Sequence, residues 1–295
     1  MKACGIVVEY NPLHNGHVYH IQASKQLTGA DCVIAVMSGP FLQRGEPALI
    51  DKFSRARSAL QSGVDIVIEL PYPFAVQSSE WFAKGAIFSL NELGIQSLCF
   101  GSESGNIQPF IDRYELQKKH QQSYDFYVKS FIDKGLSYPK AHMEAAKQIQ
   151  GKEKKLDLSQ PNNILGFQYL KTVLDHQLPI ELHTIQRTNH FHDERMSTEL
   201  ASATSIRKHL FKHQKITDKL RSTMPPSSIE QLSAYYERAG QWHHWEHYFP
   251  LLLYKVMTMD EKELANIEGV DEGLEYRIKK KAQHATSFNE WVRAI

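Results

Sequence analysis

Four short apolar runs, three of them rich in valine and isoleucine, are spaced through the first part of the chain and constrain its fold more than any other feature. They span residues 3–8, 32–37, 65–70 and 96–100, and amphipathic stretches separate them at 16–27, 47–61 and 79–93. Runs that are apolar at successive positions are typical of strands buried on both faces of a parallel sheet. Strand–helix–strand repeats of this length predict right-handed crossovers. We therefore expect an α/β fold with a Rossmann-like, doubly wound parallel sheet.

The pattern becomes more helical further along the chain. Residues 106–155 are polar and helix-biased, with basic residues at Lys118-Lys119 and from Lys152 to Lys155, and this favours a solvated helical insertion. The α/β pattern then resumes with a helix, a strand and a helix predicted at 163–174, 180–185 and 205–211. Only helical patterns follow Thr217. We expect an α/β domain over 1–215, with its insertion at about 106–155, and a helical domain over 216–295.

Composition and cysteine usage exclude several classes of protein. The net charge is +1, so any contact with nucleic acid needs a local basic patch rather than an overall basic field. Three cysteines without a Cys-x-x-Cys pair argue against a disulfide framework and a zinc site, and we predict no bound structural metal. The sequence shows no signal peptide and no apolar stretch of the roughly 20 residues that a membrane helix needs. We expect a cytoplasmic protein without membrane contact.

The turn after the first predicted strand is rich in groups that can bind an anion. In His14-Asn15-Gly16-His17, the glycine lets the backbone approach a ligand, and the helix that it opens directs free amides toward that point. Ligands of doubly wound sheets bind beyond the carboxyl ends of the strands, where this turn falls. Two histidines at this spacing are more often surface residues or a metal pair, but this position favours donors to phosphate oxygens. Together these groups suit a displacement at phosphorus.

A second anion-binding pattern begins at Ser202. The segment Ser202-Ala203-Thr204-Ser205-Ile206-Arg207-Lys208 leads hydroxyl groups into a helix that carries a basic pair. The hydroxyls can cap this helix, and its amide end can meet phosphate. Taken alone, the segment is an ordinary helix cap with solvated charges. Its place after a predicted strand, in a chain that also carries the histidine turn, favours a role in nucleotide binding.

These two segments resemble the paired signatures of the nucleotidyltransferase superfamily of the H-x-G-H type, which includes class I aminoacyl-tRNA synthetases and adenylyltransferases. The resemblance implies that residues 1–215 form an ATP-binding catalytic domain. It also implies that His14 and His17 contact the ATP phosphates and that Ser205 and Arg207 face the β- and γ-phosphates. Arginine suits such forked recognition of oxygen better than lysine. His14, His17 and Arg207 would be the catalytic groups.

Further motifs resemble those of the tRNA(Met) cytidine acetate ligase family. They lie in order at 9–17, 38–48, 100–103 and 161–166, and at Arg187 with His192-Asp193. The resemblance implies an enzyme that uses ATP to convert acetate into acetyl-adenylate and then acetylates N4 of the wobble cytidine of elongator tRNA(Met). The implied ATP site comprises Val7, Val8, Glu9, Tyr10, Asn11, Pro12, Leu13, His14, Asn15, Gly16, His17, Val18, Tyr19, His20, Gly101, Asn162, Arg187 and Ser205.

The chemistry of acetate fits these residues. Acetate is ionised at neutral pH, so its attack on the α-phosphorus needs no general base, only charge neutralisation and positioning. Mg²⁺ is expected with pyrophosphate as the leaving group, and without an evident carboxylate cage it would be held mostly by phosphate and water. The residue that takes the proton of the cytidine amine is not evident.

Two alternatives to the ligase function stay open, a small-molecule adenylyltransferase and a non-catalytic RNA-binding protein on the same scaffold. No stable protein partner is predicted.

The last segment carries a basic cluster. Residues 264–274 are followed by Arg277 and by Lys279, Lys280 and Lys281, which resembles a helix-hairpin-helix element that binds a nucleic-acid phosphate. An αα-hairpin with a solvated basic face explains the same pattern, and both interpretations stay open. The three lysines are the predicted tRNA contacts. His243, His244 and His247 alternate with tryptophans, which favours a packed helix over a metal site.

Overall fold

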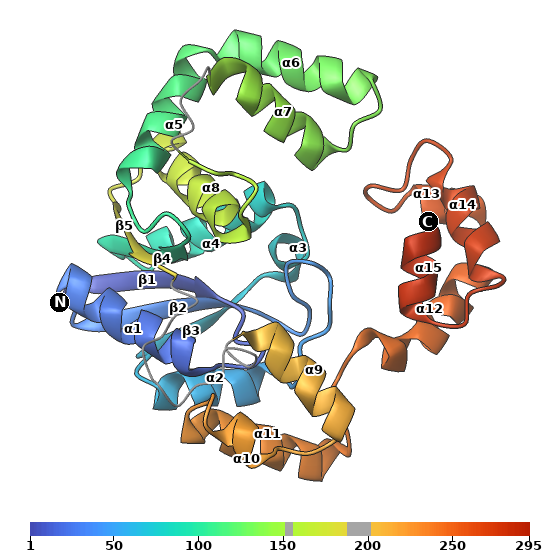
Figure 1. The fold of residues 1–295 in the computed structure, drawn as a ribbon, viewed down its shortest axis with the longest axis horizontal. Helices are drawn as coiled ribbons and strands as arrows, with labels where there is room; N and C mark the ends of the chain where they lie inside the picture. Colours follow the sequence, from blue (N-terminus) through green and yellow to red (C-terminus); the bar gives the residue numbers. More distant parts are fainter. Residues whose placement is uncertain (151–155, 188–201) are drawn as a thin grey trace.

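The computed structural model describes residues 1–150, 156–187 and 202–295, and within them one parallel sheet carries the fold. Its strands are β1 (Ala3–Val8), β2 (Cys32–Ser38), β3 (Ile66–Leu70), β4 (Ser97–Ser102) and β5 (Glu181–Gln186). They pair in the order β3-β2-β1-β4-β5, and every pair is parallel (Figure 1). The predicted doubly wound sheet is confirmed. Its order reverses between β1 and β4, which is where ligands bind in open α/β sheets.

Alternate residues of each strand build two apolar cores, one on each face of the sheet. Ile34 and Val36 of β2 point to the face that α4 (Ser79–Glu92) and α8 (Pro161–Asp175) cover. Val33 and Ala35 point to the other face, under α1 (Asn15–Thr28) and α2 (Lys52–Gln61). All four side chains are buried, which explains why the strand has no polar alternation. Figure 1 shows the two pairs of helices on opposite sides of the sheet.

Two helices of this unit differ from the sequence prediction. The helix expected from residue 47 begins at Lys52, because Asp51 caps it by accepting a hydrogen bond from the Ser54 amide at 2.9 Å. Residues before it serve another purpose, since Pro47 forms an isolated bridge with Phe41. A one-turn helix, α3 (Tyr72–Ala75), follows β3 and was not predicted. A turn of four residues is too short to show a helical period.

The insertion folds into α5 (Gln108–Lys119), α6 (Gln121–Asp133) and α7 (Tyr138–Gln150). It is not solvated throughout. Phe110 of α5 is fully buried in the core with α4 and α8, whereas Tyr124, Ala145 and Ala146 form a separate small core between α6 and α7. The basic run from Lys152 to Lys155 lies outside the described residues. The helical insertion is therefore anchored to the α/β unit through α5.

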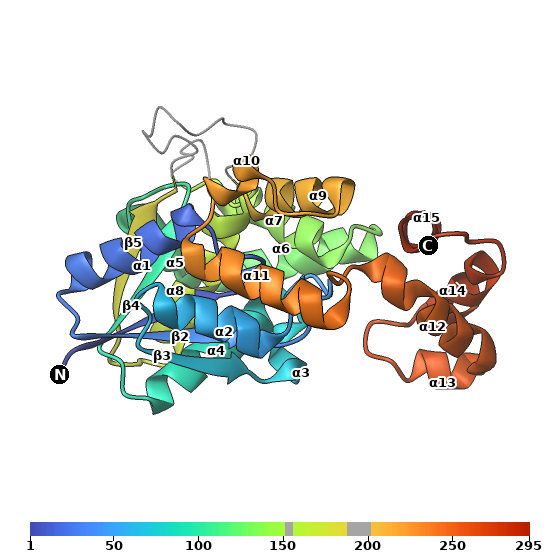
Figure 2. The same ribbon diagram turned by 90° about the horizontal axis from the view of Figure 1, so that it is seen from below.

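The remaining helices divide between two apolar clusters. They are α9 (Ala203–His213), α10 (Asp218–Arg221), α11 (Pro226–Ala239), α12 (Trp245–Thr258), α13 (Glu261–Ala265), α14 (Leu274–Ala282) and α15 (Phe288–Ala294). The first cluster contains apolar residues of α9, α10 and α11 together with Trp242, Leu49 and Ile50. Because Leu49 and Ile50 belong to the α/β unit, these three helices pack on it. The second cluster holds α12, α14 and α15 together, and Figures 1 and 2 show this group apart from the sheet. We propose that the boundary between the two units lies near Trp242 rather than at 215.

Asn15, at the first position of α1, links the histidine turn to the segment before α11. Its backbone amide donates to the carbonyl of Thr223 at 3.0 Å, and its side-chain amide donates to the carbonyl of Ser222, also at 3.0 Å. The start of α1 is thus held from both the sheet and the helical half of the chain. None of the described helices combines the length and the apolar character needed to cross a membrane.

Candidate active site

A cavity of about 1290 Å³ opens at the carboxyl ends of β1, β4 and β5. It is lined by most of the residues that the sequence predicted for ATP: Val7, Val8, Glu9, Tyr10, Asn11, His14, Asn15, Gly16, His17, Tyr19, His20, Gly101, Asn162, Arg187 and Ser205. Arg207 also lines it. Pro12, Leu13 and Val18 do not; Leu13 and Val18 belong to the apolar core under α1. The structure therefore brings the two sequence signatures to one site, at the point where the strand order reverses.

His14 and His17 cap the first helix reciprocally. The Nδ1 atom of His14 accepts a hydrogen bond from the amide of Gly16 at 3.1 Å, and the Nδ1 atom of His17 accepts one from the amide of His14 at 3.2 Å. Their rings stack with centroids 3.8 Å apart. A neutral imidazole whose Nδ1 accepts a hydrogen bond carries its proton on Nε2. Each ring therefore offers one Nε2–H donor, and the helix cap fixes which nitrogen it is.

The histidines of this turn are held neutral. Burial lowers the pKa of His14 to about 4, and the positive charge of Arg187 lowers it further. Burial and the neighbouring rings and Arg187 hold the pKa of His17 well below its usual value, and burial with Arg187 lowers the pKa of His20 to about 4. The Nε2 atom of His20 is buried without a hydrogen-bond partner among the described residues. These rings can donate hydrogen bonds but do not supply positive charge at neutral pH.

We predict that the free energy of unfolding falls when the pH is lowered from 7 to 5. In this range the unfolded chain protonates its histidines, near their usual pKa of about 6.5, whereas His14 in the folded chain stays neutral because its pKa is about 4. The unfolded state then binds more protons, so stability is lost as the pH falls. The expected loss is about 2 kcal/mol for each such histidine.

Urea unfolding of the wild type and of His14→Asn at the two pH values measures this loss. The asparagine variant should lose about 2 kcal/mol less than the wild type on acidification, because it lacks one of the buried imidazoles. His284→Ala, which removes an exposed histidine, is the matched control and should keep the wild-type pH dependence. The same loss in all three proteins would show that the buried imidazole is not its source.

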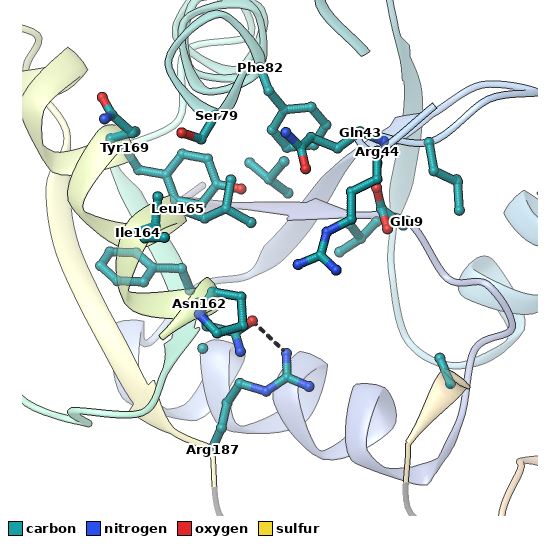
Figure 3. Close-up of a pocket in the computed structure, with 18 of the residues that line it drawn as sticks. Glu9, Gln43, Arg44, Ser79, Phe82, Asn162, Ile164, Leu165, Tyr169 and Arg187 are labelled. Carbon is teal, nitrogen blue, oxygen red and sulfur yellow. Dashed lines mark hydrogen bonds between the residues drawn. The ribbon is translucent and has the colours of Figure 1, made fainter. Parts of the chain in front are cut away.

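Arg187 is positioned by a chain of contacts at the ends of β4 and β5. Its Nη1 donates to Oδ1 of Asn162 at 3.0 Å, as Figure 3 shows. Asn162 in turn donates through Nδ2 to Glu103 at 2.6 Å, and Glu103 accepts from the backbone amide of Asn163 at 2.9 Å. A Cβ atom on Gly101 would lie only 3.1 Å from the Arg187 side chain. The glycine therefore leaves room for the arginine to cross the end of β4.

The second signature is also in place, but Arg207 already has partners. Ser202 and Ser205 form a reciprocal cap at the start of α9, and the Oγ of Ser205 donates to the carbonyl of Ser202 at 2.8 Å. Arg207 donates through Nη1 to the carbonyl of Asn11 at 2.7 Å and through Nη2 to Glu46 at 3.1 Å. It thus ties α9 to the turn after β1. The contact of Ser205 and Arg207 with phosphates stays a prediction.

Several residues that support or line the cavity were not among the site residues predicted from the sequence; the first of them, Arg55, supports the cavity from outside its lining. Arg55 on α2 is only 2% exposed and donates to the carbonyls of Ile50 at 3.3 Å, of Glu9 at 2.7 Å and of Gly39, which fixes the carboxyl ends of β1 and β2. Burial lowers its pKa to about 10, so it stays charged. In the sequence it looks like any polar residue of an amphipathic helix. Gln43 and Arg44 belong to the 38–48 motif but were not assigned to the site, and the lining residues that reasoning from the sequence missed include Phe82, Gln117, Tyr124, His142, Met143 and Tyr169.

The residues predicted to contact tRNA, and the histidine group for which a metal site was considered and rejected, are not part of the described lining of this cavity. Lys279, Lys280 and Lys281 are on α14, which a loop joins to α13 as a helix-hairpin-helix element requires. Lys279 donates to the carbonyl of Met259 at 2.7 Å and pairs with Glu261 at 3.2 Å, whereas the other two lysines are exposed. His243 bonds to the hydroxyls of Tyr235 and Tyr248. Within residues 1–150, 156–187 and 202–295, no group of three metal-ligating side chains gathers. His192 and Asp193, which were named among the family motifs, fall outside the described residues.

The fold and site together define a nucleotidyltransferase, and comparison with known proteins identifies the family. The model of the HIGH nucleotidyl transferase family matches residues 1–295. The tRNA(Met) cytidine acetate ligase of Oceanobacillus iheyensis is 49% identical over 296 residues, which cover 100% of this chain and 74% of that protein. The ligase of the same name from Bacillus subtilis is 45% identical over 299 residues and is covered to 72%. The chain belongs to the tRNA(Met) cytidine acetate ligase family.

A solved relative has the same fold. The crystal structure of Thermotoga maritima TmcAL bound with α-thio ATP matches with a TM-score of 0.90 and 35% identity, over 100% of this chain and 70% of the other. The apo form of the same protein matches with a TM-score of 0.88. The predicted fold class and family are thereby confirmed.

Proposed function

We propose that this chain joins acetate to ATP as acetyl-adenylate and transfers the acetyl group to N4 of the wobble cytidine of elongator tRNA(Met). The observation that carries the proposal is the pair of neutral histidine donors at the start of α1, which face a cavity at the strand-order reversal. The names of relatives up to 49% identical support the tRNA substrate, and a neighbour bound with α-thio ATP supports the nucleotide. A tRNA substrate would place the enzyme in the cytoplasm, and we propose no stable protein partner.

The first step needs donors and positive charge rather than a base. One carboxylate oxygen of acetate attacks the α-phosphorus, the bond between this phosphorus and the bridging oxygen breaks, and pyrophosphate leaves with the electron pair. No proton moves. The Nε2–H groups of His14 and His17 would donate to the phosphate oxygens on which charge grows, and Arg187 would lie against the nucleotide beside Gly101.

Mg²⁺ would neutralise charge on the departing pyrophosphate. The carboxylates among the described cavity residues are Glu9, Glu46 and Glu80. Glu46 is paired with Arg207 and Glu80 with Lys84, while Glu9 accepts a hydrogen bond from the Gln43 amide and burial raises its pKa. These residues do not form a carboxylate cage. We propose that the ion is held mainly by phosphate oxygens and water, as Mg²⁺ commonly is.

The second step has room at the insertion end of the cavity. Gln117, Tyr124, His142 and Met143 line that end, and they come from α5, α6 and α7 rather than from the sheet. The volume of about 1290 Å³ exceeds the roughly 300–1,000 Å³ of a typical small-molecule site, which suits two substrates. The cytosine must leave its stack to reach the mixed anhydride. We propose that it approaches from this end.

A labelling experiment tests the whole reaction. The protein is incubated with ATP, labelled acetate and total tRNA, and the tRNA is digested to nucleosides. We expect the label in N4-acetylcytidine, dependent on ATP, and pyrophosphate exchange that requires acetate but not tRNA. AMP transfer to a phosphorylated small molecule would support a simple adenylyltransferase instead. RNA binding without turnover of ATP would support a non-catalytic binding protein.

A further inference from the structure

Adenylation of acetate brings two anions together, so the acetate subsite needs a cation of its own. Among the described residues that line the cavity, the side chains that are positive at neutral pH are those of three arginines, Arg44, Arg187 and Arg207. The charge of Arg207 is matched by Glu46 at 3.1 Å. His14 and His17 are neutral in the folded protein. Within the described lining, this leaves the guanidinium groups of Arg44 and Arg187 to offset the charges of ATP and acetate.

Of these two, Arg187 belongs to the nucleotide side of the site. It lies across Gly101 at the end of β4 and is oriented by Asn162 at the start of α8. Both partners are on the β4–β5 half of the sheet. Arg44 comes from the other half, because it follows β2, which lies on the opposite side of β1 from β4. Figure 3 shows its guanidinium reaching into the cavity and facing that of Arg187. A nucleophile held there would approach the nucleotide from the side opposite to Arg187.

The backbone around Arg44 is fixed by hydrogen bonds, whereas its side chain has no hydrogen bond to any other described residue. The amide of Leu42 donates to the carbonyl of Glu46 at 2.9 Å, and Gly45, with φ of 75°, closes the turn by donating to the carbonyl of Leu42 at 2.8 Å. The amide of Gln43 donates to Glu9 at 2.9 Å. In contrast, the Arg44 guanidinium makes no hydrogen bond or ion pair within the described part of the chain. It is a cation that is aimed at the cavity and has no counterion among residues 1–150, 156–187 and 202–295.

An apolar wall lies beside this cation. Figure 3 shows Phe82 next to Gln43, and Leu165 and Tyr169 on the α8 side of the cavity across from it. Phe82 and Tyr169 are only 3% and 5% exposed and belong to the apolar core, so packing holds their side chains in place. A charged end next to a confined apolar end matches a carboxylate with a short alkyl group. The phosphates of the nucleotide are charged and gain no stabilisation from apolar side chains, so this surface does not indicate a phosphate subsite.

We propose that Arg44 is a catalytic residue that binds the carboxylate of acetate, with Phe82 and Leu165 around its methyl group. The proposal rests on the function given above and names the subsite of its second substrate. Arg44 offsets the repulsion between the carboxylate and the α-phosphate, and a carboxylate oxygen that accepts one hydrogen bond from the guanidinium keeps a second lone pair with which to attack. A guanidinium suits this task because its planar fork matches a carboxylate, and it needs no proton exchange.

The test is acetate-dependent pyrophosphate exchange by Arg44→Ala and Arg44→Lys, together with ATP binding measured by calorimetry. We expect Arg44→Ala to raise the KM for acetate about 10- to 100-fold, which is typical for loss of a hydrogen-bonded charge partner. Its Kd for ATP should stay within about threefold of wild type, which also shows that the variant folds. Arg44→Lys should be intermediate, because it keeps the charge and loses the fork. Added guanidinium ion should partly restore Arg44→Ala.

Arg57→Ala is the matched control, since Arg57 is exposed on α2 and outside the cavity, and it should behave as wild type. Weaker ATP binding by Arg44→Ala with an unchanged KM for acetate would assign the residue to the triphosphate and overturn the proposal. Wild-type values for both constants would overturn it as well. If the wild-type protein itself exchanges pyrophosphate without any need for acetate, the proposed function fails first, and this outcome is distinct from the other two.

Discussion

Replacing either histidine of the first turn should lower acetyl-adenylate formation by ~10²-fold or more, as is usual when a donor to transition-state charge is lost. His14→Ala also removes the side chain that caps α1, which by itself costs about 0.5–2 kcal/mol of stability. His14→Asn separates the two effects, because asparagine is a good cap and cannot place a donor where the imidazole Nε2–H lies. The rate of acetate-dependent pyrophosphate exchange is the measurement.

His14→Asn and His17→Ala should therefore be nearly inactive while ATP still stabilises them against heat. His284→Ala changes an exposed histidine that is not part of the described cavity lining, and it should exchange pyrophosphate at the wild-type rate. Wild-type exchange in both active-site variants would sink the role assigned to these rings. Loss of activity only in variants that also unfold at the assay temperature would point to the helix cap instead.

The second large effect is expected at the basic end of α14. We predict that changing Lys280 and Lys281 together to Ala weakens tRNA binding and lowers the slope of log affinity against log salt by ~1.4 to 1.8, since each lysine that neutralises a phosphate contributes ~0.7 to 0.9. Lys279 is left unchanged, because its bonds to Met259 and Glu261 hold α14 against α13. Binding of tRNA across a salt series is the measurement.

Acetyl-adenylate formation without tRNA should stay near normal in this double variant, because no residue of α14 is among the described residues that line the cavity. Lys279→Ala is the informative contrast. It should lower the melting temperature of the C-terminal unit more than it changes the salt slope. Unchanged tRNA affinity in the double variant would leave the helix-hairpin-helix interpretation without support, and equal loss of both activities would mean that α14 supports the fold.

The sheet could be predicted because its signal is local. Val33 to Val36 alternate between two buried faces, and such a strand leaves an unbroken apolar run in the sequence. The histidine turn could be predicted for the same reason, since its residues are neighbours in the chain. The hydrogen bonds between the two histidines could not be predicted. Their reciprocal caps, which set the tautomers of the rings, depend on the backbone angles at His14.

Residues that act through distant partners left no signal. Arg55 looks like a solvent-facing arginine until the ends of β1 and β2 meet around it. Gln117 and Met143 belong to a stretch that composition alone assigns to solvent, yet they line the cavity. Arg207 matched a signature, but its ion pair with Glu46 joins residues far apart in the chain. Such contacts depend on how segments pack, and no periodicity in the sequence records them.

The two bonds from Asn15 to Ser222 and Thr223 have a consequence for anyone who wishes to dissect this chain. A fragment that ends where the α/β pattern ends, near residue 215, would keep every nucleotide-binding motif and yet lose both carbonyls that hold the start of α1. It would also expose Leu49 and Ile50, which α10 and α11 cover. A minimal catalytic fragment should therefore extend past Trp242, where the apolar packing on the sheet-bearing half ends.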